Sequence, residues 1–273
     1  MRKWFGYTLL IAATLSLTTA TGFAQKKFDS QMTCNDSWGN DRLQNHCEIR
    51  EQTLPSGGTI DVDAGQNGGV AVKGWDKNEV LVRSRVQTSA PTLAEAEALA
   101  KQVIVQTGGL RVRAEGPASQ RDYGWWVSYE LYVPRHSDLM LASHNGGIAI
   151  VDVNGKMEFR ALNGGVALRG VGGNVHGSTT NGGLAVELSG DRWDGEQLDV
   201  RTTNGGVSMT LPENYSAHLE TSTVNGSVNI DFPITVQGRI TKEISVNLGS
   251  GGPLVRAVTT NGGIRVKRAG LKG

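Results

Sequence analysis

The chain is built around one short motif, Asn-Gly followed by a small residue and then an aliphatic one, which occurs seven times. Three and five residues after each Asn stands an apolar side chain, while the residue between them is small or polar. This alternation has a period of two, as a strand with one buried face requires, so each Asn-Gly opens a β-strand. The seven copies begin at Asn67, Asn145, Asn163, Asn181, Asn204, Asn225 and Asn261.

A second strand precedes each of the later corners. Six, four and two residues before Asn145 stand Leu139, Leu141 and Ser143, and the other later copies repeat this taper from large to small side chains. The repeating unit is therefore a strand, a tight Asn-Gly corner, a second strand and a looser corner.

The spacing of the copies indicates how the units stack. The intervals from Asn145 to Asn163 and from Asn163 to Asn181 are both 18 residues, and the later ones are 23, 21 and 36. A unit of two short strands cannot bury its own apolar face, so it must stack on its neighbours. We expect an all-β protein with a right-handed-type β-solenoid, whose rungs lie about 4.8 Å apart. The alternative is an antiparallel sandwich, because Asn-Gly is also the strongest hairpin signal.

The corner residues have a chemical rationale. Glycine adopts positive φ without a Cβ penalty and Asn tolerates that region, so turn chemistry alone accounts for the motif. A corner Asn repeated on every rung can in addition stack its amide on its neighbours, as in Asn ladders. Both interpretations remain open at this point.

The first 24 residues predict export. Arg2 and Lys3 precede an apolar run, and Ala24 ends a stretch of small residues that a signal peptidase could recognise. The run is shorter than the ~20 residues of a membrane span, so we expect none after cleavage, although an uncleaved anchor is the alternative. Cleavage leaves 27 − 2 = 25 basic and 26 acidic residues, a net charge of −1, which argues against nucleic acid as a partner. The expected location is periplasmic, cell-surface or secreted.

Residues 25–50 hold both cysteines, Cys34 and Cys47. In an exported protein, an even pair this close in sequence predicts a disulfide. A zinc site using His46 is the alternative, but zinc needs four ligands and the sequence has no second cluster.

The main domain is expected over residues 51–273, with an insertion at 78–133. A capping box at Thr92 and Glu95 starts a helix near 93–103, and residues 103–106, 110–114 and 125–133 are predicted strands. Aromatic residues in this region suit a cap that covers the end of the solenoid core, or a ligand platform. The platform candidates are Trp125, Trp126 and Tyr129, with Trp193 in a later loop.

The segment Val133-Pro134 with 139–150, echoed at Leu54-Pro55 and Leu211-Pro212, resembles the bacterial putative adhesin family of the DUF4097 type. The resemblance covers about residues 50–268. It implies a β-solenoid at the bacterial envelope and no established catalysis. The segment with the two cysteines departs from the family's repeat pattern.

Catalysis is not expected from the residues themselves. Solenoid enzymes gather carboxylates on one face, whereas the outer column from Lys73 to Lys267 mixes both signs, and the acidic run 191–199 is predicted to be a solvated loop. The five histidines lack ligand spacing, and no cofactor or metal is predicted. We expect a non-enzymatic protein that presents a binding face to an envelope protein or a surface glycan. The alternative is a polysaccharide-binding or polysaccharide-degrading solenoid.

Overall fold

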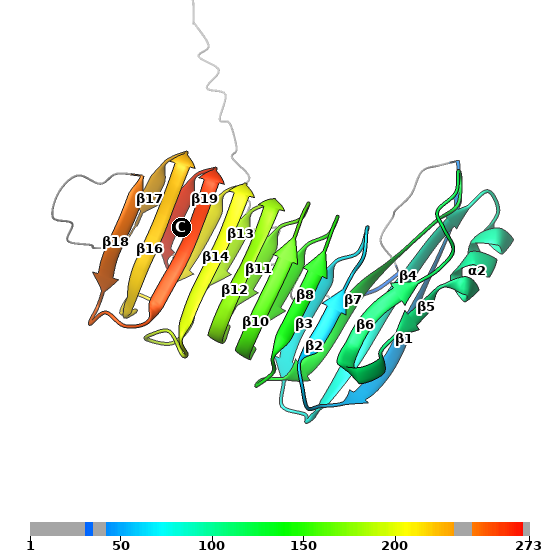
Figure 1. The fold of residues 1–273 in the computed structure, drawn as a ribbon, viewed down its shortest axis with the longest axis horizontal. Coiled ribbons are helices and arrows are strands. Elements are labelled where there is room, and N and C mark those ends of the chain that lie inside the picture. The colour runs from blue at the N-terminus through cyan, green and yellow to red at the C-terminus, as the bar shows by residue number, and fades with distance from the viewer. Residues whose placement is uncertain (1–30, 35–41, 232–241, 270–273) are drawn as a thin grey trace, which may run out of the picture.

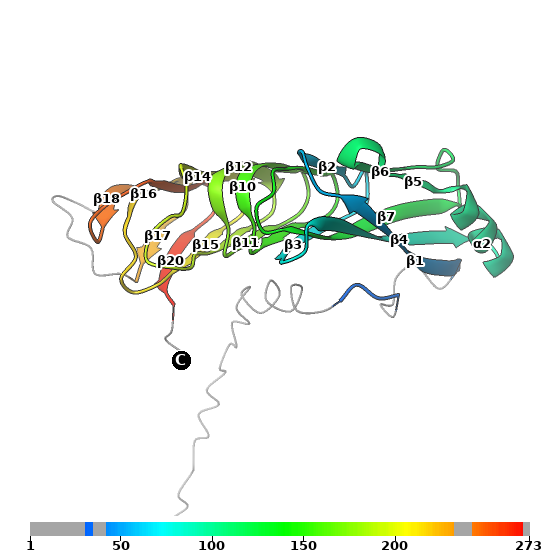
Figure 2. The same ribbon diagram turned by 90° about the horizontal axis from the view of Figure 1, so that it is seen from below.

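The computed structural model describes residues 31–34, 42–231 and 242–269, so the expected signal segment lies outside the described residues. Two sheets of ten strands each face one another along an elongated molecule (Figures 1 and 2). Sheet A has the order β1-β4-β7-β3-β9-β11-β13-β15-β20-β17, and sheet B has the order β18-β16-β19-β14-β12-β10-β8-β2-β6-β5. The apolar residues of both sheets form one continuous core between them.

Each Asn-Gly corner joins one strand of sheet B to one strand of sheet A, and we call such a pair a rung. The seven rungs are β2 (Ile60–Asp63) with β3 (Val70–Trp75), β8 (Leu139–Ser143) with β9 (Ile148–Val151), β10 (Asn154–Ala161) with β11 (Val166–Arg169), β12 (Gly172–Asn181) with β13 (Leu184–Glu187), β14 (Gln197–Asn204) with β15 (Val207–Leu211), β16 (Ala217–Asn225) with β17 (Val228–Ile230), and β19 (Leu254–Asn261) with β20 (Ile264–Arg268).

Neighbouring rungs pair in parallel and in the register that the motif predicts. Val166 lies beside Ile148 on one side and Leu184 on the other, and Asn181 lies beside Asn204. Parallel pairing between successive repeats is incompatible with two-residue hairpins, which join antiparallel strands. The fold is therefore a β-solenoid, and the antiparallel sandwich is wrong.

The core is filled by the alternating apolar columns. Leu168, Val186 and Met209 are all buried, while Ala185 between the columns points outward and is half-buried. Side-chain volumes compensate across rungs: Phe159 occupies the space beside Gly177, where an added Cβ would meet the Phe159 ring at 2.2 Å.

The last rung in the chain is not the last rung in the stack. Strand β19 lies between β14 and β16, and β20 lies between β15 and β17. The chain thus makes the β16–β17 rung one position further out, passes through β18 (Glu243–Leu248) antiparallel to β16, and then fills the gap. Asn261 begins the last copy of the motif in the sequence, and the order of the copies alone predicts that it lies near the open end of the stack. That prediction is wrong, because Asn225 occupies the end of the Asn series.

The other end of the stack is closed by strands of different geometry. Strand β7 (Gly124–Pro134) continues sheet A beside β3, and β4 (Glu79–Ala90) and β1 (Gln44–Pro55) add antiparallel to it. Sheet B ends with β6 (Arg111–Glu115) and β5 (Ile104–Gln106), after the short 3-10 turn η1 (Gly108–Leu110). Helix α2 (Leu93–Gln102) lies at this end (Figure 1). We call α2 together with β1, β4, β5, β6 and β7 the cap. Strand β1 crosses the domain boundary expected at residue 50.

Candidate functional site

The seven corner asparagines form one continuous ladder of side-chain hydrogen bonds along an edge of the solenoid. From the second Asn onward, each Nδ2 donates to the Oδ1 of the preceding rung over donor–acceptor distances of 2.7–3.0 Å, in the stack order Asn67, Asn145, Asn163, Asn181, Asn204, Asn261 and Asn225. All seven side chains are exposed. The ladder therefore exists, but it lies on the outside of the corner and not in the core.

The glycine after each Asn is needed for close approach between rungs and not for positive φ. None of these glycines has a positive φ. A Cβ on Gly164 would stand 2.0 Å from the carbonyl oxygen of Gly146, and one on Gly182 would stand 2.2 Å from that of Gly164. The positive φ angles lie instead mostly in other loops, for example at Asp152 and Gly170. The expected reason for the glycine was therefore wrong, because stacking and not turn geometry excludes the side chain.

Buried hydroxyls fix the same corners from the inside. Thr179 Oγ1 donates to the carbonyl of Gly164 at 2.7 Å, and Thr202 Oγ1 donates to that of Gly182 at 2.7 Å. Ser143, Thr259 and Thr223 make the equivalent bond to the preceding rung. Each hydroxyl satisfies a carbonyl that would otherwise lie next to the apolar core.

The outer face of sheet A carries two columns of small residues over the central rungs. Its column next to the corner consists of Gly69, Gly147, Gly165, Gly183, Gly206 and Gly263, and the following outward column consists of Ala71, Ala149, Ala167, Ala185 and Ser208. We call this surface the flat face. Within these two columns no side chain is larger than a methyl or hydroxymethyl group, so a partner can approach the backbone closely there. Larger side chains, among them Arg169, Glu187 and Thr210, form the next outward column and border the flat face.

The four candidate platform aromatics do not share one surface. Tyr129 and Trp193 are 1% and 2% exposed, so neither can stack on a ligand. Trp193 Nε1 donates to the carbonyl of Gly173, whereas the Tyr129 hydroxyl has no partner among the described residues and burial raises the pKa of this phenol. Trp125 and Trp126 are half-buried, and their indole N–H groups donate to Pro117 and Gln87. The platform interpretation is wrong for Tyr129 and Trp193, because alternation in the strand and the packing of the loop turn both inward.

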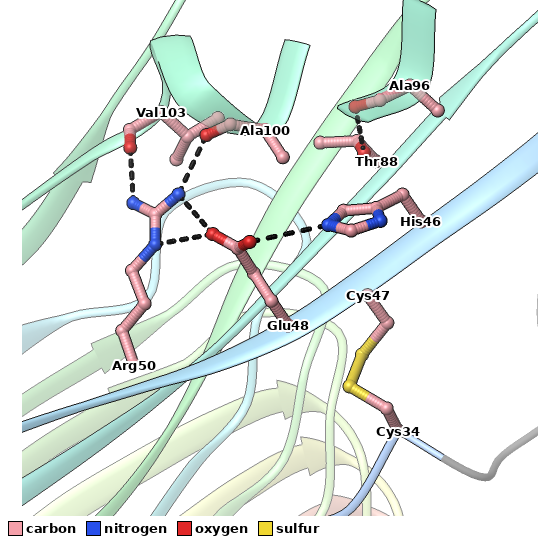
Figure 3. Close-up of polar contacts among 9 residues, drawn as sticks. All are labelled: Cys34, His46, Cys47, Glu48, Arg50, Thr88, Ala96, Ala100 and Val103. Atoms are coloured by element: carbon pink, nitrogen blue, oxygen red, sulfur yellow. Dashed lines mark hydrogen bonds and ion pairs between the residues drawn. A yellow bond between two sulfur atoms is a disulfide. The ribbon is translucent and has the colours of Figure 1, made fainter. Parts of the chain in front are cut away.

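The predicted disulfide joins Cys34 to Cys47 on strand β1 (Figure 3). Next to Cys47, His46 and Arg50 both contact the carboxylate of Glu48. Arg50 also donates to the carbonyls of Val103 and Ala100, which closes the C-terminal end of helix α2. Burial raises the pKa of Glu48, but hydrogen bonds from Arg50 and His46 outweigh it and leave the pKa below its ordinary value.

The segment before Cys34 lies against the outer side of the cap. Arg83, only 7% exposed, contacts the carboxylates of Glu51 and Glu130, and its guanidinium reaches the carbonyl of Met32. Arg85 donates to the carbonyl of Thr33 at 3.1 Å. Burial lowers the pKa of Arg83, but the two carboxylates outweigh it, so this cation is held in its charged form.

The acidic loop around Trp193 is occupied by structural contacts. Asp194 accepts a hydrogen bond from Asn154 at 2.8 Å, Glu196 accepts one from Asn174 at 2.6 Å, and Asp199 pairs with Arg201 and Arg256.

In the part of the chain that the structure describes, no three His, Cys, Asp or Glu side chains converge as metal ligands. No helix of that part is long and apolar enough to span a membrane.

Comparison with solved structures finds several bacterial proteins. A crystal structure described as a putative cell adhesion protein from Clostridium sporogenes shares 12% identity, covers 82% of this chain and 100% of its own, and has a TM-score of 0.43. Putative adhesins from Bacteroides fragilis and Parabacteroides merdae share 10% and 11% identity, each with a TM-score of 0.34. They cover 82% and 85% of this chain and 97% and 98% of their own chains. No curated protein matches the chain.

The family comparison is specific to the stacked part of the molecule. The model of the Toastrack DUF4097 family matches residues 132–267, from the end of β7 to the last rung. This range contains six of the seven Asn-Gly rungs described above. The chain therefore belongs to the DUF4097 (Toastrack) family.

Proposed function

We propose that this protein is a non-enzymatic, adhesin-like binding protein of the bacterial envelope, which presents the flat face of its solenoid to an envelope protein or a surface. The observation that carries the proposal is the flat face itself, where glycine and alanine recur in register over the central rungs. Parallel strands whose inner columns are all buried make this face rigid, so a partner binds it without a large ordering cost.

Export is part of the proposal and is supported by two features. Residues 1–24 have the pattern of a signal peptide, and a disulfide such as Cys34–Cys47 persists in oxidising compartments outside the cytosol. The same two features support a location in the periplasm, on the cell surface or in the medium.

The alternative, a solenoid that binds or degrades polysaccharide through an aromatic platform, has less support. Two of its four aromatic residues are buried, and the carboxylates around Trp193 are engaged by Asn154, Asn174, Arg201 and Arg256. A general acid and base would need carboxylates free to exchange protons with a substrate.

The test is binding of the purified exported protein to intact cells, envelope fractions and a glycan array. Ala167→Arg places a long cation in the middle of the flat face, and Ala142→Arg places the same side chain at an exposed position on the outer face of sheet B. We expect Ala167→Arg alone to abolish binding while both variants melt like the parent. Equal binding by the two variants would contradict the proposal, as would reducing ends released from a polysaccharide by the parent protein.

A further inference from the structure

A polar groove lies where the cap meets the stack, and none of its lining residues belongs to the flat face. The loop after β1, the turn before β4, the loop after β7 and the first residues of β10 surround it, and its volume is about 410 Å³. This volume is at the lower end of the ~300–1,000 Å³ range of small-molecule sites. We propose that this groove is a binding site for a neutral, hydroxyl-rich ligand, a saccharide. This inference does not depend on the proposed function.

The walls of the groove are held in place by their own hydrogen bonds. Ser56 Oγ donates to Asn78 Oδ1 at 2.7 Å, and Asp138 Oδ1 accepts from the backbone N–H of Lys156 at 2.8 Å. Asn154 Nδ2 donates to Asp194 Oδ2 at 2.8 Å. A ligand therefore meets side chains whose rotamers are already fixed, which lowers the entropy cost of binding.

Each of these side chains keeps hydrogen-bonding capacity for a ligand. The bonds above leave the second carboxylate oxygen of Asp138, the amide N–H groups of Asn78 and the amide oxygen of Asn154. The imidazole of His136 has no partner among the described residues and is exposed at the groove. The groove thus offers donors and acceptors together, the combination that hydroxyl groups match because each hydroxyl both donates and accepts.

The charged residues at the groove limit the class of ligand that it can bind. Asp138 is the only Asp, Glu, Lys or Arg among the lining residues, and the neighbouring Arg135 is paired with Asp76 at 2.7 Å. An anion would meet an uncompensated carboxylate. A cation would gain little, because a pair with a solvent-exposed carboxylate contributes only ~0–1 kcal/mol. Pro134, with Ile60 and Val80 behind it, supplies an apolar wall for the C–H face of a sugar ring.

The experiment titrates the full chain with glucose, galactose, N-acetylglucosamine and their β-linked disaccharides by calorimetry. Inorganic phosphate and the dipeptide glycyl-lysine serve as the anionic and cationic probes. The groove variants are Asp138→Asn, which retains the acceptor for Lys156, and His136→Ala, which removes a side chain without described partners. The matched control is Asp231→Asn, because Asp231 is exposed and directly follows β17, the strand at the far end of the stack.

We expect at least one saccharide to bind saturably, with affinity at least tenfold weaker in Asp138→Asn, at least threefold weaker in His136→Ala and unchanged in Asp231→Asn. The absence of saturable saccharide binding would overturn the inference. So would tighter binding of phosphate or glycyl-lysine, or saccharide binding unaffected by both groove variants. Because Ala167→Arg does not touch the groove, loss of partner binding in that variant with saccharide binding intact separates this site from the flat face.

Discussion

At the scale of single residues, the two glycines of each Asn-Gly-Gly corner have different roles. The Cβ of an alanine at position 164 would stand 2.0 Å from a backbone oxygen of the neighbouring rung, whereas at position 165 the nearest atom is 3.4 Å away. The first glycine is thus fixed by the stack, and the second lies on the flat face.

We therefore expect Gly164→Ala to lower the free energy of unfolding by about 3 kcal/mol or more, since the backbone of two rungs would have to separate. Gly165→Ala should stay within about 1 kcal/mol of the parent. Urea unfolding followed by circular dichroism measures both. Equal losses in the two variants would show that the corners need glycine for turn geometry after all.

The Asn ladder predicts a dependence on position. Asn181 makes two ladder bonds, to Asn163 and from Asn204, whereas Asn225 at the end makes one, to Asn261. At about 1 kcal/mol for each net hydrogen bond, Asn181→Ala should cost roughly twice as much as Asn225→Ala. Thermal melts test this, and Asn261→Ala should resemble Asn181→Ala because Asn261 is flanked on both sides. A cost for Asn261→Ala as small as that for Asn225→Ala would contradict the order of the rungs.

At the scale of strands, alternation decides which face is buried. Val186 points into the core and Ala185 points outward on the same strand, β13. Val186→Asp would place an unpaired charge in an apolar interior and should prevent folding or cost several kcal/mol, while Ala185→Asp should be tolerated. Circular dichroism and melting of the two purified variants provide the measurement. Similar losses would mean that β13 is not a wall of the solenoid.

At the scale of the cap, Glu48 links strand β1 to helix α2 through Arg50. Because the folded pKa of Glu48 lies below its ordinary value of 4.5, its contribution to stability is present above that value and is lost as the pH falls through the folded pKa. The protection factors of the α2 amides against hydrogen exchange should therefore fall below about pH 4.5 in the parent protein. Glu48→Gln should flatten this dependence, and Glu97→Gln, exposed on α2, should not. A parent profile no steeper than that of Glu48→Gln would argue against the link.

The strands of the rungs and the helix could be predicted because their signals are local, whereas β1, β4 and β18 carry no such motif and were not predicted. Period-two alternation defined the rungs, and the Thr92–Glu95 capping box placed a helix that begins at Leu93. Alternation along β7 could have shown that Tyr129 points inward, whereas the burial of Trp193 depends on which neighbours cover its loop and could not be predicted. The groove was also missed, because Asn78 and Asp138 lie in two separate loops and Asn154 begins β10, and only the assembled stack brings them together.

At the scale of the whole molecule, the order of the rungs does not follow the order of the chain. All rungs carry the same apolar columns, so any of them fits beside any other, and the motif alone cannot rank them. The sequence signal that could have revealed this order of rungs is the long interval of 36 residues before Asn261, which leaves room for β18 and a return across β16. The position of the β16–β17 rung therefore depends on β19 and β20, the last strands of the chain, because these two strands join it to the rest of the stack.

Engineered disulfides test this stack most directly. Thr203 and Thr260 lie next to each other on adjacent strands, whereas Thr203 and Val224 are separated by the inserted rung. At about 4.8 Å per rung, the first pair falls within the ~4.4–6.8 Å Cα separation of a disulfide and the second does not. We predict that Thr203→Cys with Thr260→Cys forms an intramolecular disulfide in the folded protein, seen by intact mass and peptide mapping, and that Thr203→Cys with Val224→Cys remains reduced. A bridge in the second variant and free thiols in the first would show rungs stacked in chain order and would contradict the structure on which the flat face and the groove depend.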